Sequence, residues 1–321
     1  MRLSVWWTLY GTDTWSSSGV RLPKILPQRD VPLPMAEGEF LALTTSTPPS
    51  PNQLVNPSLP MSELSVPAES LMAYSVLLNQ RLARIDEVNS HAVSGDLYGQ
   101  DLLEAVSDIS MDLEAWKCAL PEHMQNIAGN MEYWTQQGLS TAFVLLHIDF
   151  NHFNQLLFYQ FLHGSAQRAS PFSRTHQYAQ KCRHHATELS NLIHLASVTP
   201  RAQPLYSLGG HVLAIASTAL LHTFLFADNE VEQQSARRLL ERNFEFLTTL
   251  REYWPCLDVT FSRFEAFHNA CMHCRDDSHF RMDQWMLKFM HEFAKPISER
   301  RWDTMGEQKT EKWSLASLGL K

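Results

Sequence analysis

Hydrophobic residues recur at intervals of three and four positions through most of the chain after Ser70. The clearest run steps by four, three, four and three positions, through Leu102, Val106, Ile109, Leu113 and Trp116. This spacing places all of these side chains on one face of an α-helix. We therefore predict an amphipathic helix over 102–116. The Leu120-Pro121 pair ends it, because proline disfavours the helical conformation of the residue before it.

The same periodicity predicts helices along the rest of the chain. An aromatic-rich helix runs from Leu139 to Phe161, and the Asp228-Asn229 pair begins another helix that has acidic residues in its first turn. Further helices are expected over 70–91, 178–196, 208–226, 264–274 and 285–293. No series of alternating strands with hairpin turns is visible in the sequence. We predict an all-α fold, an irregular multi-helix bundle of roughly eight helices with a proline-rich N-terminal excursion.

The N-terminal segment combines a short helical pattern with a run of prolines. Helical spacing puts Trp6, Leu9 and Tyr10 on one apolar face, with Asp13 one turn further on. Prolines at positions 23, 27, 32 and 34 then exclude helix and force an extended excursion. We divide the chain into an N-terminal helix with its extended motif, a flexible Pro/Ser/Thr-rich connector, a helical core and a polar tail, over 1–36, 37–69, 70–296 and 297–321.

The composition is typical of a globular protein and disfavours two function classes. Apolar residues make up 44% and charged residues 19% of the 321 positions. Only 12 glycines are present, which argues against a glycine-rich nucleotide-binding fold. The net charge of −8 argues against a surface that grips the phosphates of DNA. The most apolar window, 142–162, contains Asp149 and Asn151, so we expect a core helix there and no membrane span.

The cysteines and histidines offer one ligand-like cluster. Five cysteines, at 118, 182, 256, 271 and 274, suit a reducing compartment in which thiols pack as small hydrophobic groups. Cys271-Met-His273-Cys274 lies between His268 and His279, and two thiolates with two imidazoles suit zinc. Because the sequence has no second Cys-x-x-Cys, we interpret the cluster as core cysteines with surface histidines, with zinc as the alternative.

Other candidates for chemistry are weaker. His147, Asp149 and His152 suggest a metal or a general base, although we favour a satisfied polar face of a buried helix. We interpret His184-His185 as a solvent-edge pair and Gly209-Gly210 as a helix entry, with an anion site as the alternative for the glycines. The sequence contains no hydrolase elbow, phosphate-binding loop or metalloprotease motif. We expect no catalysis, no cofactor and no metal.

The N-terminal segment also carries a recognisable order of residues. It reads Trp6-Trp7, Tyr10 and Asp13 in the helical part, then Val20-Arg21-Leu22-Pro23, then Asp30-Val-Pro-Leu-Pro34. This order resembles the conserved segment of the fungal-specific transcription factor domain, the regulatory middle region of fungal binuclear zinc-cluster activators. In that family an Arg-rich helix that carries aromatic pairs, a Tyr and an Asp leads into a Gly-Arg-Pro turn and an Asp-x-x-x-x-Pro tail. The turn here has one extra residue. We expect Asp13 and Arg21 to pair across this turn.

Later segments resemble the same family. Leu113-Glu-Ala-Trp116 followed by Leu120-Pro121 matches a family helix that ends in Trp and then Leu-Pro. In the run from 146 to 162, Phe150 falls on the family's aromatic position, whereas residues 158–160 replace its His-Arg-Pro. From Cys182 to the Trp254-Pro255 junction, the helices follow the family's order. The family-motif residues are Trp6, Trp7, Tyr10, Asp13, Arg21, Pro23, Trp116, Pro121, Phe150, Phe161, Trp254 and Pro255.

The resemblance implies a regulator of transcription, including that of secondary metabolism, which works in the nucleus. It implies contacts with proteins of the transcription machinery or with a full-length zinc-cluster factor, and a possible small-molecule effector. The family's zinc cluster needs two Cys-x-x-Cys halves with basic residues, and this chain has one and no basic run. We therefore expect no direct DNA binding, no membrane contact, and a truncated or split gene product or a stand-alone remnant. An all-α biosynthetic-pathway enzyme and a helical interaction scaffold are the alternatives.

Overall fold

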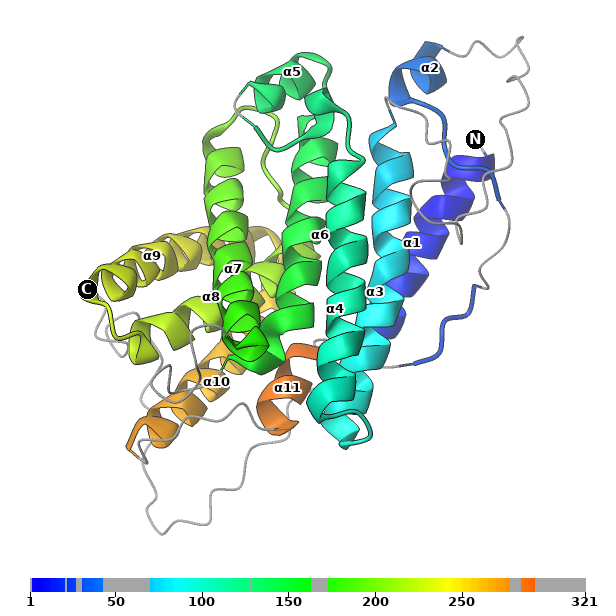
Figure 1. Cartoon of the computed structure of the whole chain (residues 1–321). Coiled ribbons are helices and arrows are strands. Elements are labelled where there is room, and N and C mark those ends of the chain that lie inside the picture. The colour runs from blue at the N-terminus through cyan, green and yellow to red at the C-terminus, as the bar shows by residue number, and fades with distance from the viewer. Residues whose placement is uncertain are drawn as a thin grey trace. The chain divides into compact units, whose positions relative to one another are not determined.

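The computed structural model describes residues 2–20, 22–26, 31–42, 70–127, 129–162, 173–276 and 284–291. Within these ranges it contains eleven α-helices and three short 3₁₀ helices, with no strand (Figure 1). The all-α prediction is confirmed. The predicted number of roughly eight helices is wrong, in part because α2 (Glu37–Ala42) and α5 (Asn130–Gln136) are too short to show periodicity in the sequence.

The chain forms two compact units, which we describe one at a time. The first comprises Met1–Phe153 with Thr199–Gln203, and the second comprises Asn154–Val198 with Pro204–Lys321. The boundary falls inside α6 (Ser140–Phe158), so this helix begins in the first unit and ends in the second.

In the first unit, α3 (Leu71–Ser94) packs on both α1 (Arg2–Val20) and α4 (Gly99–Cys118), as Figure 1 shows. The short η2 (Glu122–Met124) and α5 follow α4. The buried residues of α3 include Asn79 and Arg81, and at its centre the fully buried aliphatic side chains are Leu77, Leu78, Leu82 and Ile85. They recur at helical spacing, so the amphipathic pattern of the sequence accounts for the position of α3.

Side chains and a glycine satisfy the ends of α3. At its start, Ser70 Oγ accepts a hydrogen bond from the N–H of Ala73, and the Glu37 carboxylate accepts from Leu71 (3.1 Å) and Met72 (2.8 Å). At its end, Gly95 has a φ of 84°, which a residue without Cβ adopts readily. Glu37 belongs to α2, which occupies the first six residues of the predicted connector. The remainder, 43–69, lies outside the described residues.

The buried face of α1 differs from the predicted one. Trp7 and Tyr10 are each 3% exposed, whereas Leu9 is 52% exposed, so its placement on the buried face was wrong. The buried face continues through Thr14, whose hydroxyl donates to the Tyr10 carbonyl oxygen and so leaves no unsatisfied donor. After α1, residues 22–26 and 31–36 adopt neither helix nor strand.

In the second unit, α8 (Ser207–Phe226) packs on α7 (Arg174–Val198), α9 (Glu230–Tyr253) and α10 (Asp258–Asp276). It is long and apolar enough to cross a bilayer by length and composition, and 78% of its apolar window is buried inside the protein. Burial in the core therefore accounts for its composition. Among the described helices, α8 meets this criterion, and the predicted window 142–162 does not. The unit also contains η3 (Tyr159–Phe161), η4 (Pro255–Leu257) and α11 (Gln284–His291).

The predicted start of α9 is confirmed. Asn229 Oδ1 accepts a hydrogen bond from the N–H of Val231 at 2.9 Å. Glu230 and Glu232 lie in the first turn, where negative charge interacts favourably with the helix dipole.

Gly210 allows η4 to lie against α8. A Cβ atom at this position would be 2.3 Å from Cδ2 of Leu257, a side chain that is 3% exposed. At Gly209, a Cβ atom would be 3.1 Å from the Tyr206 ring. The glycine pair therefore serves close packing at the beginning of α8.

We expect Gly210→Ala to destabilise the protein and Gly11→Ala to stabilise it. The first adds a methyl group against buried Leu257, at a cost of about 1–2 kcal/mol. The second lies within α1 with no neighbouring atom within 4 Å of the added Cβ, so the better helix propensity of alanine gains about 0.5–1 kcal/mol. Urea unfolding midpoints test both variants. A Gly210→Ala midpoint equal to or above that of the wild type would contradict this packing role of Gly210.

Candidate functional site

The N-terminal family-motif residues form a compact aromatic group in the first unit. The rings of Trp7 and Tyr10 meet edge to face at 5.5 Å, and Trp7 Nε1 donates to the Pro32 carbonyl oxygen at 2.8 Å. Lys24 Nζ lies 3.8 Å from the centroid of the Tyr10 ring, a cation–π contact. Burial, and secondarily Asp13, raises the pKa of Tyr10. Helix α1 thus holds the chain that follows it through two of its aromatic side chains.

Asp13 binds backbone N–H groups of the segment after α1. Its Oδ2 accepts hydrogen bonds from the N–H groups of Ile25 (3.0 Å) and Leu26 (2.9 Å). Arg21, the partner expected from the sequence, lies outside the described residues, so their pairing stays a prediction. Pro23 is exposed, and Trp6 is half-buried. The carboxylate therefore fixes the turn through the backbone, an arrangement that residue types alone do not reveal.

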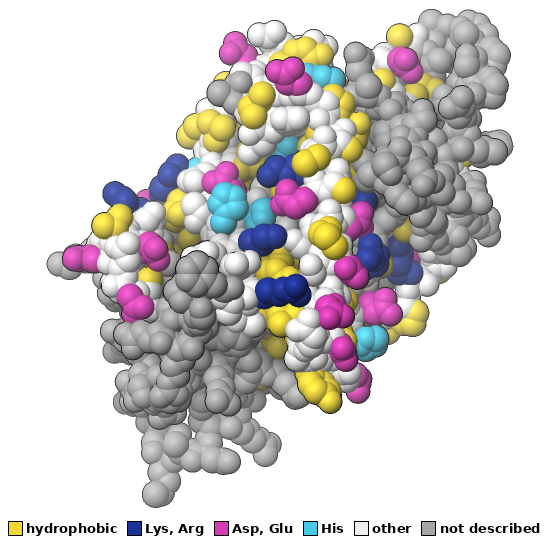
Figure 2. Space-filling view, viewed as in Figure 1, with side chains coloured by type: hydrophobic (Ala, Val, Ile, Leu, Met, Phe, Trp, Pro, Cys, Tyr) yellow, Lys and Arg dark blue, Asp and Glu magenta, His cyan; other side chains and the backbone are white. Residues whose placement is uncertain are grey.

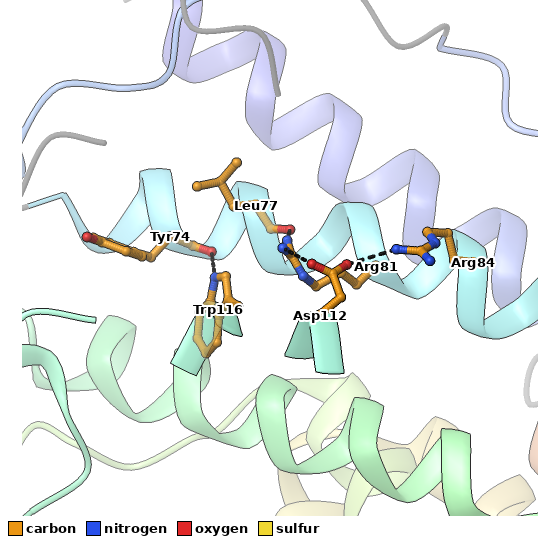
Figure 3. A network of polar contacts seen from close by, with 6 residues as sticks. All are labelled: Tyr74, Leu77, Arg81, Arg84, Asp112 and Trp116. Atoms are coloured by element: carbon orange, nitrogen blue, oxygen red, sulfur yellow. Dashed lines mark hydrogen bonds and ion pairs between the residues drawn. The ribbon is translucent and has the colours of Figure 1, made fainter. Parts of the chain in front are cut away.

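Trp116 joins α4 to α3 at the centre of the first unit. Its indole is fully buried and donates from Nε1 to the Tyr74 carbonyl oxygen at 3.0 Å (Figure 3). Because the acceptor is a backbone carbonyl within α3, this hydrogen bond fixes the position of α4 along the axis of α3. Pro121 follows α4 and precedes η2, in agreement with the predicted helix end.

A charged pair reinforces the same helix contact one turn away. Arg81 donates from Nη2 to Asp112 Oδ1 at 2.7 Å and from Nη1 to the Leu77 carbonyl oxygen, and Arg84 donates to Asp112 Oδ2 at 2.9 Å (Figure 3). The Arg81 side chain is 9% exposed and that of Asp112 29%. Burial lowers the pKa of Arg81, and Asp112 opposes this shift. The two arginines of α3 thus share one carboxylate of α4.

Two family-motif segments meet in the first unit. The rings of Trp116 and Phe150 stack with centroids 5.4 Å apart and planes at 19°. Phe150 is 4% exposed, and Lys117 Nζ lies 5.7 Å from its ring centroid. The two aromatic positions singled out from separate parts of the sequence are therefore direct neighbours.

The other family-motif residues belong to the second unit. Phe161 is 5% exposed and its ring lies 5.0 Å from that of Tyr178 on α7. Trp254 is 39% exposed, and its Nε1 donates to the Leu205 carbonyl oxygen at 3.1 Å. Pro255 is the first residue of η4. Each of these residues secures a helix end or a turn.

His147 is a satisfied core residue, as expected. It is 4% exposed, and its Nε2 lies 2.9 Å from the Met124 carbonyl oxygen, which fixes Nε2 as the protonated nitrogen. Burial lowers the pKa of His147 to about 4. His152 is also buried and stacks on Trp15 at 5.7 Å. The carboxyl of Asp149, by contrast, has its pKa raised to about 8 by burial, so it is largely protonated at neutral pH.

Asp149→Asn is expected to stabilise the protein, increasingly so as the pH rises. Folded Asp149 keeps its proton up to a pKa of about 8, whereas the unfolded residue loses it near the ordinary value. The wild-type chain therefore loses stability between about pH 4 and pH 8. The variant removes this loss. Because the residue is only partly buried, we expect a gain of about 1–2 kcal/mol at pH 8 and almost none at pH 4.

Melting temperatures of Asp149→Asn at several pH values test this. Asp108→Asn on the exposed side of α4 is the matched control, and we expect no pH-dependent gain from it. A gain from Asp149→Asn that is the same at pH 4 and pH 8 would contradict the retained proton.

The cysteine and histidine cluster is only partly described. Cys271 is fully buried, as the core interpretation requires, but His268 is 7% exposed, so its assignment to the surface was wrong. The side chains of His273 and Cys274, and all of His279, lie outside the described residues. Within the described residues, no three His, Cys, Asp or Glu side chains come together as a metal site would require. His184 is exposed, but His185 is buried, which corrects half of the predicted solvent-edge pair.

The sequence reasoning missed a buried polar network in the second unit. Asn243 of α9 is fully buried and donates from Nδ2 to Ser190 Oγ of α7 (3.1 Å) and Ser217 Oγ of α8 (3.0 Å). Its Oδ1 accepts from His194 Nε2 at 3.1 Å. Burial lowers the pKa of His194 to about 4. The available signal was a lone asparagine between Leu239 and Leu247, on the apolar face of α9.

These residues hold helices together, and most of the polar side chains described above hydrogen-bond to the backbone or to another side chain. The arrangement is that of a packed helical scaffold in both units. Comparison with known proteins adds nothing further, because no family model, no curated protein and no solved structure matches this chain.

Proposed function

We propose that the chain is a regulatory domain of the fungal-specific transcription factor type, which acts in the nucleus through partner or ligand contacts. The stacking of Trp116 on Phe150 carries the proposal. Both residues are family-motif positions of the resemblance, and they are 34 residues apart in the sequence. Their direct contact supports the proposal, because conserved motifs of one domain are expected to pack against each other.

Charge supports an action that does not depend on gripping DNA. The chain carries a net charge of −8. On the face that Figure 2 presents, acidic, basic and hydrophobic side chains are interspersed. Phosphate-backbone binding draws on clustered Lys and Arg. We therefore propose that regulation proceeds through another protein that reads the DNA.

The transcriptome of fungal cells that produce the chain on induction tests the regulatory function. We expect a reproducible set of transcripts to change within the first hour of induction. The Trp116→Ala variant, in which the packing centre is lost, should leave the same transcripts unchanged. A wild-type chain that accumulates in the nucleus without changing any transcript contradicts the proposal.

A gel-shift assay with the purified chain tests the indirect action separately. We expect no sequence-specific shift from a pool of random double-stranded DNA, because the sequence contains no run of Lys and Arg that could bind the phosphates. Tight binding to one enriched sequence would show that the chain reads DNA itself.

A helical interaction scaffold is the second candidate. The observation that favours it is the exposed apolar group at the junction of α9, η4 and α10 in the second unit. Tyr253 is 60% exposed, Trp254 39% and Val259 52%. Exposed aromatic side chains of this kind are enriched at protein–protein interfaces. The transcriptome experiment separates the two candidates, since a scaffold without a regulatory role leaves transcripts unchanged.

A further inference from the structure

Asn243 interrupts the apolar face with which α9 packs on α8 and α7. Asn243 is 0% exposed. It lies among apolar residues of α9 that are at most 7% exposed, and these are Leu239, Leu240, Phe244 and Leu247. Because large apolar side chains recur at every turn of this face, apolar packing alone leaves the position of α9 along its neighbours weakly determined.

The two serines that contact Asn243 have no proton to donate to it. Ser190 Oγ of α7 donates to the Ala186 carbonyl oxygen, and Ser217 Oγ of α8 donates to that of Leu213, both at 2.8 Å. A hydroxyl has one proton, so each serine accepts on the side of Asn243. The serines therefore require the Nδ2 group of Asn243 and use both of its protons, at 3.1 and 3.0 Å.

The orientation of the Asn243 amide determines the tautomer of His194. With Nδ2 on the serines, Oδ1 of Asn243 lies 3.1 Å from His194 Nε2, and Nε2 must carry the proton of this hydrogen bond. His194 follows Ser190 by one turn of α7 and is 6% exposed. We call Asn243, Ser190, Ser217 and His194 the Asn243 network. Each hydrogen bond between its members has one donor and one acceptor, and a flipped amide would not satisfy the serines.

A displacement of α9 by one helical turn would break the Asn243 network. Depending on the direction, it would bring to the serines an apolar side chain, one of Leu239, Leu240, Phe246 and Leu247. None of these side chains donates a hydrogen bond. Asn243 would then be buried among apolar groups, which is costly for an amide without hydrogen bonds. The network therefore penalises the alternative registers of α9.

We propose that the Asn243 network is a conformational device that selects one arrangement of α7, α8 and α9, and that it does so without adding to the stability of the fold. Replacing a whole buried polar network by apolar side chains of similar volume often leaves a protein as stable or more stable, because the desolvation of the polar groups offsets their mutual attraction. A single buried asparagine fixes the register of coiled-coil helices in the same way, at a cost in stability. The proposal goes beyond the regulatory function and holds for a scaffold equally.

An all-apolar version of the network tests the proposal in the full chain. It combines Asn243→Leu, Ser190→Ala, Ser217→Ala and His194→Leu. We expect its urea unfolding midpoint to be equal to or above that of the wild type. Its amide NMR spectrum should show more than one set of signals for α7, α8 and α9, because several registers are populated, whereas the wild type shows one set.

Thr223→Val is the matched control. Thr223 is a buried residue of α8 whose hydroxyl bonds within its own helix, to the Ala219 carbonyl oxygen at 3.0 Å, so the variant should keep one set of signals. An all-apolar variant that also shows one set overturns the proposal, because the arrangement is then selected without the network. A midpoint below that of the wild type, or failure to fold, overturns it as well, because the network then serves stability.

A single substitution gives a second readout in variants that change less. Ser190→Ala leaves one proton of the Asn243 amide without an acceptor, so it should lower the urea midpoint of the wild type by about 0.5 M. In the Asn243→Leu background, which has no amide, the same substitution should not lower the midpoint. Equal shifts in both backgrounds would show that the two residues are not coupled, and the proposal would fail.

Discussion

Trp116→Ala is expected to lower the free energy of unfolding by about 3–5 kcal/mol, the usual range for removing a fully buried aromatic side chain. Trp116 is 0% exposed, stacks on Phe150 and donates its indole N–H to the Tyr74 carbonyl oxygen. The variant loses all three contributions and leaves a cavity between α3 and α4. Urea unfolding followed by far-UV circular dichroism measures the change.

Two further tryptophan variants separate these contributions. Trp116→Phe keeps an aromatic ring for Phe150 but removes the indole hydrogen bond to the Tyr74 carbonyl oxygen, so we expect a loss of about 1–2 kcal/mol. Trp254→Ala removes a tryptophan that is 39% exposed, and we expect a loss of about 1 kcal/mol. If Trp116→Ala costs no more than Trp254→Ala, Trp116 is not the anchor of the first unit.

Asp112→Ala is expected to cost about 2–3 kcal/mol, because it leaves the Arg81 guanidinium buried without its carboxylate. The Arg81 side chain is 9% exposed and its Nη2 lies 2.7 Å from Asp112 Oδ1. The Asp112 side chain is 29% exposed. Because water screens the pair, we expect a smaller cost than for a fully buried pair. Thermal or urea unfolding measures it.

A second substitution shows whether the cost of Asp112→Ala comes from the unpaired buried charge of Arg81 or from the loss of packing contacts of Asp112. Arg81→Met in the Asp112→Ala background removes the buried charge, so the double variant should be more stable than Asp112→Ala alone. Glu241→Ala breaks the Arg237–Glu241 pair of α9, in which both side chains are 31% exposed, and should cost at most about 0.5 kcal/mol. Equal losses from Asp112→Ala and Glu241→Ala would show that the α3–α4 pair contributes no more than a surface ion pair.

The sequence predicted the long helices well because each carries enough turns for periodicity to appear. The run from Leu102 to Trp116 is an example: its last member is the buried anchor of α4, and Pro121 follows the helix as predicted. The cap of α9 at Asn229 was also readable, because it depends on a local side chain to backbone bond. A single sequence therefore predicts helix caps, which depend on neighbouring residues, and long helices, in which the hydrophobic periodicity recurs over several turns.

Contacts between distant segments were not readable in the same way. On α1, helical spacing fits both Trp6, Leu9 and Tyr10 and the set Trp7, Tyr10 and Thr14. The second set is buried, whereas Leu9 of the first is 52% exposed. Asp13 binds the backbone of Ile25 and Leu26, a partner without a residue-type signature. Asn243 reaches two serines of other helices, and only their packing brings them together. Each miss required knowledge of which segments meet.

The output of a reporter gene to which the chain is tethered tests the regulatory account most directly. The full chain is fused to an unrelated DNA-binding module in a fungal reporter strain, beside the module alone and a Trp116→Ala fusion produced at the same level. The account predicts that the wild-type fusion changes reporter transcription in either direction and that the Trp116→Ala fusion does not. A wild-type fusion that is stable, nuclear and bound at the reporter, with transcription equal to that of the module alone, would contradict it.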